Sequence, residues 1–332
     1  MRQYVKHYKL YAVLFVGVLT VSCDKAESTV VAYDSNRLNM VIADNFNLSL
    51  LSASLRVSGL DKELQSNDGP ITVLAPSDAA FGKAGYNNTV SILSERPSVV
   101  SQLVKYHLMD GKYELNKLPF LFNQEIRTRG GKVFATRWAK GADTVLTLNG
   151  ARVVATNIPA SNGIIQVLDR VLTPYQHDKI MDAIVAQPNI TLFAQALQRS
   201  GLAQTLAENG PYTVFAPSNM AMEALGYRTV QQIEGIAVEE LKRLVDYHIV
   251  RDRRFIYDYI LSTGPSNVSR QAMLDGNSVA ITLKKATGST SLFDGITLKG
   301  LGNTTAVSVI KQDILTGNGV LHIVDQALRI TQ

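Results

Sequence analysis

Residues 71–81 read ITVLAPSDAAF, and residues 212–222, which begin 141 positions later, read YTVFAPSNMAM. The β-branched residues at the start of each copy indicate a strand, and a proline, which cannot donate a ladder hydrogen bond, ends it. The pairs Ser77-Asp78 and Ser218-Asn219 then offer side-chain oxygens to cap the first turn of a helix. The sequence therefore predicts one strand–turn–helix unit that occurs twice.

Two further motifs repeat in the same order. The pair Tyr106-His107 recurs 141 positions later as Tyr247-His248, and residues 161–169 (SNGIIQVLD) recur 156 positions later as 317–325 (GNGVLHIVD). The second copy therefore holds fifteen extra residues between its last two motifs. Such a long repeat predicts tandem domains at 36–174 and 177–332, and the short linker 173–177 leads us to expect that they touch.

These motifs resemble the signatures of the fasciclin (FAS1) domain family. Residues 213–222 match its opening signature nearly letter for letter, and both Tyr-His pairs match its second motif. The closing motif keeps its histidine as His322, whereas Gln166 stands there in the first copy, so any role of that histidine is expected to be absent from domain 1. The resemblance implies an α+β fold, with each domain a β-sandwich or wedge of about seven strands and several helices.

The residues between the motifs agree with this order. Helices are predicted at 49–58 and 191–200, each followed by a glycine suited to the left-handed C′ position. Asn149-Gly150 predicts a tight hairpin between strands at 145–148 and 151–154. In the second copy we expect strands at 278–284, 296–299 and 306–310, with a turn at Asp294-Gly295. Helices before hairpins favour an α+β fold over a parallel sheet.

The Tyr-His pairs are interpreted as structural. The apolar stripe over 97–108, repeated in the second domain, places His107 and His248 on the buried face of an amphipathic helix. A lone histidine there is more often a neutral core group, with one nitrogen bonded to the backbone, than a ligand or catalyst. Tyr106, Tyr247 and His322 are grouped with them.

The first residues predict export. Basic residues precede an apolar run at 10–21, which predicts a signal peptide at 1–22. Residues 19–23 (LTVSC) resemble the lipobox of bacterial lipoproteins, which implies lipidation of Cys23 and a tether at 23–35. A transmembrane anchor or plain secretion are the alternatives. The expected location is the cell envelope, lipid-anchored in the outer membrane and facing outward, although Asp24 also suits retention at the inner membrane.

Charge and cysteine content exclude other classes. The 332 residues carry a formal charge of +5, but Arg2, Lys6 and Lys9 lie in the predicted signal peptide, which leaves 30 basic against 28 acidic residues. A near-neutral mature chain gives no support for nucleic acid as a partner. The one cysteine permits no internal disulfide and no cysteine-rich zinc site.

No catalytic signature is found. The sequence lacks a Gly-x-Ser-x-Gly elbow, a His-Glu-x-x-His motif and a Walker loop. Its five histidines are scattered along the chain. We therefore predict no enzyme activity, no metal site and no cofactor, with a hydrolase built on a carboxylate pair as a third reading.

A few residues are candidates for ligand contact. Asp313, Ile314 and Leu315 resemble the Asp-Ile pair that precedes the closing motif in animal fasciclin domains and is implicated there in integrin adhesion; a buried Ile with an Asp capping a turn is the simpler reading. The remaining candidates form a basic and aromatic group that suits an acidic glycan, with a solvated face as its alternative: Arg253, Arg254, Tyr257 and Tyr259. A variable loop is expected at 261–272.

The resulting function is a lipid-anchored envelope protein for binding or adhesion, whose partner is another envelope protein, extracellular matrix or a glycan. The alternative is an accessory glycan-binding component of a surface polysaccharide-capture system. Its support is thinner, because sugar stacking uses exposed aromatic rings and Trp138 is the single tryptophan.

Overall fold

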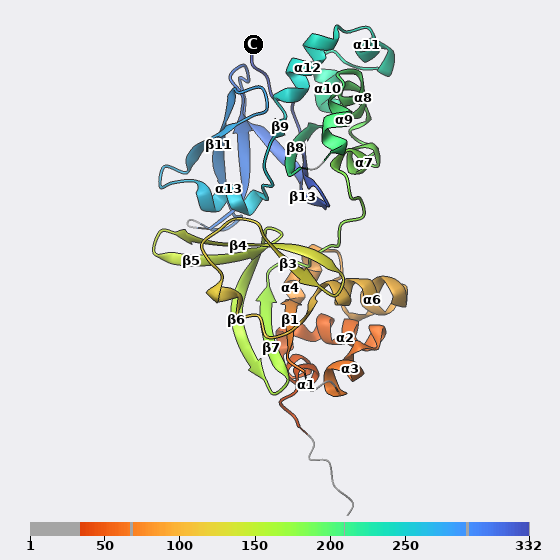
Figure 1. The fold of residues 1–332 in the computed structure, drawn as a ribbon, viewed down its shortest axis with the longest axis vertical. Helices are drawn as coiled ribbons and strands as arrows, with labels where there is room; N and C mark the ends of the chain where they lie inside the picture. The colour runs from red at the N-terminus through yellow and green to blue at the C-terminus, as the bar shows by residue number, and fades with distance from the viewer. Residues whose placement is uncertain (1–33, 67–68, 209, 290–291, 332) are drawn as a thin grey trace, which may run out of the picture. The chain divides into compact units, whose positions relative to one another are not determined.

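The computed structural model describes residues 34–66, 69–208, 210–289 and 292–331. Residues 35–332 form one compact unit. This unit contains two α+β domains of the same design (Figure 1). The predicted signal peptide and Cys23 lie outside the described residues, as does nearly all of the predicted tether.

Domain 1 begins with helices and ends with antiparallel strands. Its elements are α1 (Leu38–Ala43), η1 (Phe46–Leu48), α2 (Ser49–Ser58), α3 (Leu60–Ser66), β1 (Ile71–Pro76), α4 (Asp78–Lys83), α5 (Thr89–Leu93), α6 (Pro97–Tyr106), β2 (Leu108–Asp110), η2 (Leu115–Lys117), β3 (Gln124–Thr128), β4 (Gly131–Lys140), β5 (Asp143–Leu148), β6 (Ala151–Ala160) and β7 (Gly163–Leu168).

Domain 2 largely repeats this order, with a seven-residue α-helix in the place of η2. Its elements are α7 (Ile180–Val185), α8 (Thr191–Arg199), α9 (Leu202–Ala207), β8 (Tyr212–Pro217), α10 (Asn219–Ala224), α11 (Val230–Glu234), α12 (Val238–Asp246), β9 (Ile249–Val250), α13 (Ile256–Ser262), β10 (Val268–Ala272), β11 (Ser278–Lys285), β12 (Phe293–Lys299), β13 (Val307–Thr316) and β14 (Gly319–Val324).

Each domain contains a seven-stranded mixed sheet. The strand order is β2-β1-β7-β6-β5-β4-β3 in domain 1 and β10-β11-β12-β13-β14-β8-β9 in domain 2. The first motif strand is central and pairs in parallel with the closing motif strand, β1 with β7 and β8 with β14, whereas every other pair is antiparallel. The α+β prediction is confirmed.

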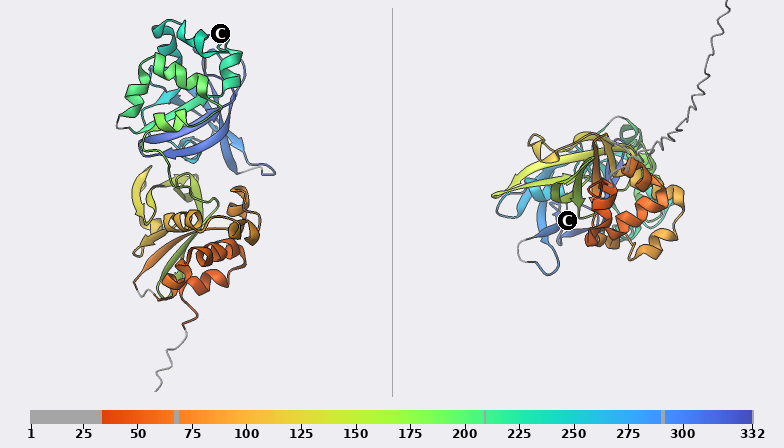
Figure 2. Two further views of the ribbon diagram at one scale, coloured as in Figure 1. Left: turned by 90° about the vertical axis from the view of Figure 1, so that its right-hand side faces the viewer. Right: turned by 90° about the horizontal axis from the view of Figure 1, so that it is seen from below.

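Each sheet splays into a wedge. Strands β5 and β6 pair only at Thr147–Arg152 and Leu148–Ala151 before they diverge. In domain 2, β12 and β13 likewise pair only at Thr297–Ser308 and Leu298–Val307. The first helices of each domain gather on one flank of the sheet, beside the central strand (Figures 1 and 2). The wedge implied by the resemblance is present in both domains.

The repeated strand is completely buried. All six residues of β1 and of β8 are buried, including a threonine in each. The Thr72 hydroxyl donates to the Gly111 carbonyl at 2.7 Å and accepts the Tyr113 N–H at 2.8 Å. Thr213 makes the same two bonds in domain 2. Buried hydroxyls are stable only when they are paired in this way.

The residues after each strand cap two helices rather than one. Ser77 and Ser218 accept the N–H three residues later at 3.2 Å and begin α4 and α10, as predicted. Asp78 does not add to that cap; its carboxylate accepts the Leu50 N–H at 2.9 Å, at the start of α2. Asn219 accepts the Leu192 N–H at 3.0 Å, at the start of α8. The second polar residue therefore fixes a distant helix onto the motif.

The local predictions are mostly confirmed. Helices occupy 49–58 and 191–199, and the hairpin turns at Asn149 and Gly150, whose φ angles are 48° and 77°. The turn expected at Asp294-Gly295 is wrong, because both residues lie inside β12, where Gly295 pairs with Lys284. The strand expected at 306–310 extends to Thr316 through two register shifts.

Candidate functional site

The two helix-end histidines are core residues. His107 and His248 are completely buried just after α6 and α12. In each, Nδ1 donates to the carbonyl four residues earlier, at 2.8 and 2.7 Å. Nε2 accepts the N–H of Leu172 or Leu328. Burial lowers the pKa of both histidines to about 4, so both are neutral.

Gln166 makes in domain 1 the two hydrogen bonds that His322 makes in domain 2. In domain 2, Nδ1 of His322 accepts the Asp313 N–H at 3.0 Å and Nε2 donates to the Arg254 carbonyl at 3.0 Å. In domain 1, the Gln166 amide accepts the Asn157 N–H at 3.1 Å and donates to the Tyr113 carbonyl at 3.1 Å. The expectation that this role is absent from domain 1 is therefore wrong, because an amide offers one acceptor and one donor as a neutral imidazole does.

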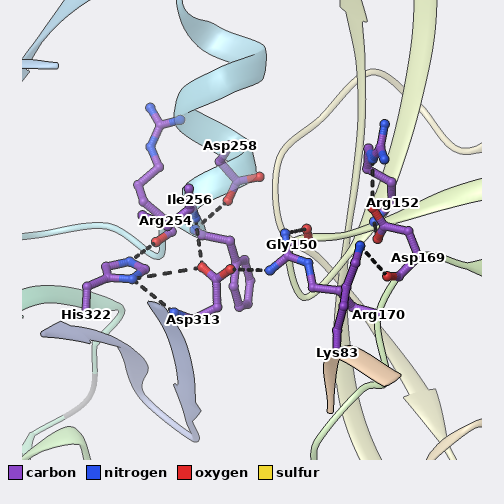
Figure 3. A network of polar contacts seen from close by, with 11 residues as sticks. Lys83, Gly150, Arg152, Asp169, Arg170, Arg254, Ile256, Asp258, Asp313 and His322 are labelled. Carbon is purple, nitrogen blue, oxygen red and sulfur yellow. Dashed lines mark hydrogen bonds and ion pairs between the residues drawn. The ribbon is translucent and has the colours of Figure 1, made fainter. Parts of the chain in front are cut away.

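Asp313 lies where the two domains meet. It sits in a bulge of β13 with a φ of 59°. Its carboxylate accepts the Ile256 N–H at 2.8 Å and pairs with Arg170 of domain 1 at 3.0 Å (Figure 3). The simpler prediction for Asp313 was that it caps a turn, and its bond to the Ile256 N–H agrees with this. The ion pair with Arg170 is a second role that was not predicted.

The two residues after Asp313 pack inward. Ile314 packs against the apolar core of domain 2. Leu315 is buried in a cluster with Phe134 of domain 1 and Phe255 of domain 2. Together with the linker 170–177, residues 311–315 line a cavity of about 430 Å³. Contact of a partner with Asp313, Ile314 or Leu315 stays a prediction, and this cavity is lined by all three.

Arg253 holds the closing motif in place. It is 6% exposed, and its guanidinium donates to the carbonyls of Thr316, Gly317 and Gly319 at 2.9–3.1 Å. Its terminal carbon lies 3.9 Å from the centre of the Phe134 ring of domain 1. Burial lowers the pKa of Arg253 to about 10, which leaves it charged at neutral pH.

Arg254 and Tyr257 also face the neighbouring domain, whereas the Tyr259 ring contacts Phe215 of its own domain. Arg254 pairs with Asp252 at 3.0 Å and lies 5.1 Å from the ring centre of Phe122 in domain 1. Tyr259 is 2% exposed, and burial raises its pKa. Tyr257 is 8% exposed beside Arg152 of domain 1. The four candidates proposed for an acidic glycan are thus largely occupied within the chain, and their contact with a ligand remains a prediction.

Some of the extra residues of domain 2 form part of its contact with domain 1. In domain 1 the corresponding segment is only η2, whereas domain 2 has α13, which lies against β4 (Figure 1). Asp258 of α13 is completely buried and accepts from Thr136 at 2.9 Å and from Asn123 at 3.2 Å, both in domain 1. Lys140 of β4 donates to the carbonyls of Ile260 and Thr263.

The prediction of a variable loop at 261–272 is wrong, because much of this segment is helix or strand. Leu261 and Thr263 are buried at the end of α13, and residues 268–272 form strand β10. The reason is that the apolar face of α13 packs on β12 and β4, so the added residues are recruited into structure. The ring centre of Trp138 in β4 lies 4.6 Å from that of Phe122, with the ring planes tilted by 40°. Both side chains pack against the apolar cluster that includes the buried residues of α13.

Within residues 34–66, 69–208, 210–289 and 292–331, no group of three His, Cys, Asp or Glu side chains is arranged to hold a metal ion. None of the helices in these described ranges is both long and apolar enough to cross a membrane.

The repeated wedge, its central motif strand and its closing strand define one domain class present twice. A family model for the fasciclin domain matches residues 46–174 and 188–330. The chain therefore belongs to the fasciclin domain family and contains two such domains.

Individual relatives of this chain share between a quarter and a third of the aligned residues with it. Periostin from Homo sapiens is 33% identical over 184 residues, which are 55% of this chain and 20% of periostin. Transforming growth factor-beta-induced protein ig-h3 from Sus scrofa is 26% identical over 301 residues, 89% of this chain and 38% of that protein. This chain thus spans well under half the length of both. A FAS1 domain pair from the insect cell adhesion molecule Fasciclin I aligns over 88% of this chain and 95% of its own, with 16% identity and a TM-score of 0.41.

The exchange of glutamine for histidine between the domains predicts the effect of two substitutions. His322→Gln is expected to change the free energy of unfolding by less than about 1 kcal/mol, because Gln166 already makes these bonds in domain 1. His322→Ala is expected to cost about 2–4 kcal/mol, because it leaves the Asp313 N–H and the Arg254 carbonyl unpaired. Denaturant unfolding measures both, and equal destabilisation would contradict the assignment.

The buried histidines predict a loss of stability in acid. Their folded pKa of about 4 lies below the value of the unfolded chain. Their contribution is therefore full above pH ~6.5 and is lost as the pH falls towards 4, at up to about 1.4 kcal/mol per pH unit and histidine. Asp258 acts oppositely, since burial raises its pKa to about 6 and favours its protonated form in the folded chain.

Urea unfolding between pH 4.5 and 7.5 tests this balance. The wild type is expected to lose stability towards pH 4.5, because three buried histidines with lowered pKa values, His322 included, outweigh one aspartate. Asp258→Asn removes the opposing titration, so its loss should be steeper. A pH-independent free energy of unfolding in both proteins contradicts the assignment.

The bond between Thr136 and Asp258 predicts coupling between the domains. Thr136→Val leaves a buried carboxylate oxygen without its donor and is expected to cost about 1–3 kcal/mol. Thr147→Val is the matched control, because this buried hydroxyl on β5 has no partner among the described residues and its removal should cost little. Calorimetry and proteolysis at residues 173–177 report the coupling. Equal behaviour of the two variants would show that the bond does not hold the domains.

Proposed function

We propose that this protein is a lipid-anchored component of the bacterial cell envelope that uses its two fasciclin domains to bind another protein or matrix. The observation that carries the proposal is that the groups best suited to chemistry are engaged inside the fold. His107, His248, His322 and Asp258 are each buried and hydrogen-bonded within the chain. This arrangement supports binding through the surface rather than catalysis in a cleft.

The contact between the domains supports the same proposal. Asp258, Lys140 and the pair Arg170–Asp313 fix one domain on the other. Burying the carboxylate of Asp258 against donors of both domains ties their relative position, because moving the domains apart leaves these groups unpaired. A partner therefore meets one composite surface, which costs less ordering on binding than two independently moving domains.

The anchor is proposed from the sequence alone. A basic and apolar leader followed by Cys23 supports diacylation of this cysteine, and more than one acyl chain suffices for stable anchoring. Outward exposure at the outer membrane follows as part of the proposal. The alternative is an accessory glycan-binding protein of a surface polysaccharide-capture system.

Cys23→Ala tests the anchor and the side of the membrane together. The wild type is expected to partition with membranes, to incorporate labelled palmitate and to be cleaved when intact cells are treated with protease. The variant is expected to be released into the soluble fraction without label. Cys23→Ser in a parallel culture controls for the size of the side chain.

The results separate the parts of the proposal. Labelled wild type that resists protease on intact cells places the anchor on the periplasmic side and removes surface adhesion. Membrane association of both variants contradicts lipidation. Failure of the purified chain to retain any envelope or matrix protein in pull-downs contradicts the binding role.

A further inference from the structure

The same tyrosine bond in both domains aligns their outer strands. The Tyr106 hydroxyl donates to the Lys132 carbonyl of β4 at 2.6 Å, and the Tyr247 hydroxyl donates to the Ser278 carbonyl of β11 at 3.0 Å. Lys132 of domain 1 therefore corresponds to Ser278 of domain 2. Counting along both strands from this pair gives the further correspondences Phe134 with Ala280, Thr136 with Thr282 and Trp138 with Lys284.

In domain 1 the outer face of β4 is covered by α13 of domain 2 (Figure 1). The Thr136 hydroxyl donates to the Asp258 carboxylate at 2.9 Å. Further along the strand, Lys140 donates to the Ile260 carbonyl at 2.7 Å. Because these contacts follow one another along both elements, the helix runs along the strand.

The corresponding face of domain 2 is open. Alternate residues of β11 are buried in the core of domain 2, so the residues between them point outward. Thr282 is exposed there, whereas its counterpart Thr136 is 1% exposed under α13. Domain 2 therefore retains the threonine that receives a carboxylate in domain 1 and presents it at the surface.

The aromatic anchors of the covered face are missing from the open one. Phe134 and Trp138 pack against apolar residues of domain 2. Ala280 and Lys284 stand in their places. An element that docks through apolar side chains, as a further fasciclin domain does here, thus loses both ring contacts on this face.

Cations surround the retained threonine instead. Arg270 and Lys299 flank Ala280 in one row across the three strands β10, β11 and β12. Lys284 is the next outward residue beyond Thr282 on β11. All three cations are exposed, and within the described residues none of them has an ion pair or a side-chain hydrogen bond. They are free to bind a partner's carboxylates.

The neighbouring carboxylates do not cancel these cations. Asp294 is the one acidic residue in the three strands, and it lies with Lys285 in the bulge at the end of β11. Asp275, in the β10–β11 turn, and Asp325, after β14, lie outside the three strands, and each accepts a backbone N–H. The rows on either side of Thr282 therefore hold three outward cations and no carboxylate.

From this correspondence we infer that the outer face of β10, β11 and β12 docks an acidic helix of a partner protein, as β4 docks α13. The Thr282 hydroxyl donates to one carboxylate of that helix, as Thr136 does to Asp258. The three exposed cations pair with carboxylates one turn before and one turn after it. The inference rests on the proposed binding function and gives it a partner class.

The spacing of the cations suits a helix that runs along β11. Successive outward residues of a strand lie ~6.6 Å apart, because each residue advances about 3.3 Å. Residues i and i+4 of a helix share a face and lie ~6 Å apart along the axis. With one carboxylate on Thr282, those four residues away come beside Lys284 and beside Ala280, between Arg270 and Lys299. A helix holds these groups on one face, so it loses less freedom on binding than a flexible acidic chain.

Fluorescence anisotropy of a labelled helical peptide with the purified chain tests the inference. The peptide carries glutamates at i, i+4 and i+8, and a side-chain crosslink on its opposite face holds it helical. An isomer of the same composition has its glutamates spread around the helix. The first peptide is expected to bind at least about fivefold more tightly than the isomer. Its binding should weaken as salt rises, because the cations are exposed.

Variants of the face separate docking from folding. Arg270→Glu with Lys284→Glu is expected to weaken binding of the glutamate peptide at least about tenfold. The same variant is expected to bind the matching lysine peptide, a gain that a folding defect does not produce. Thr282→Val is expected to weaken the glutamate peptide about two- to fivefold, because one hydroxyl donor is lost.

Arg56→Glu with Lys62→Glu is the matched control, since it reverses the same charge at exposed positions on α2 and α3. Thermal unfolding of each variant checks the fold. Absence of binding, equal binding of the isomer or of an oligogalacturonate of the same charge, or an equal loss in the control overturns the inference. Because the tests of the anchor and of the envelope partner do not use the peptide, a negative result here leaves both to be judged by their own experiments.

Discussion

The parallel pairing of the first motif strand with the last strand of each domain is the constraint on which the fold depends. β1 and β8 are buried along their whole length, so every backbone N–H and C=O on them needs a partner. β7 and β14 provide that pairing on one side. The glycines that begin these strands follow from it, because a Cβ on Gly163 or Gly319 would overlap the carbonyl oxygen of Ile71 or Tyr212.

Within this frame the two domains keep their internal hydrogen bonds and differ at their surfaces. Gln166 replaces His322 without loss of either bond. By contrast, η2 becomes the helix α13, and Asn157 at the bulge becomes Asp313, which pairs across the domains. The differences gather where domain 2 meets domain 1. Duplication thus preserved the fold and gave each copy a distinct side of one interface.

The sequence predicted what is locally determined. The motif strand, the helices at 49–58 and 191–199 and the Asn149-Gly150 hairpin depend on neighbouring residues, and all were found. Asp294-Gly295 shows the limit of this reasoning: its turn composition is overridden by pairing with β11. Composition alone could not show that a strand edge was available to these two residues.

The candidate site was harder to predict because its partners come from the other domain. Arg253 and Arg254 have the composition of a basic surface patch, yet Phe134 and Phe122 of domain 1 cover them. Arg170 and Asp313, which pair across the domains, are far apart in the sequence and form no motif. Their signal was nevertheless present in the repeat, since the aligned residues Gln326 and Asn157 are uncharged. Comparing the copies residue by residue detects them, whereas searching for motifs does not.

The polar contacts between the domains have a second consequence. Asp258 and Arg170 are costly to bury, and apolar residues of similar size could join the domains at least as firmly. Polar contacts of this kind instead fix one relative orientation, because donors and acceptors of the two domains meet only when the domains keep this arrangement. The buried polar contacts therefore support an interpretation in which they set the orientation of the second domain on the first.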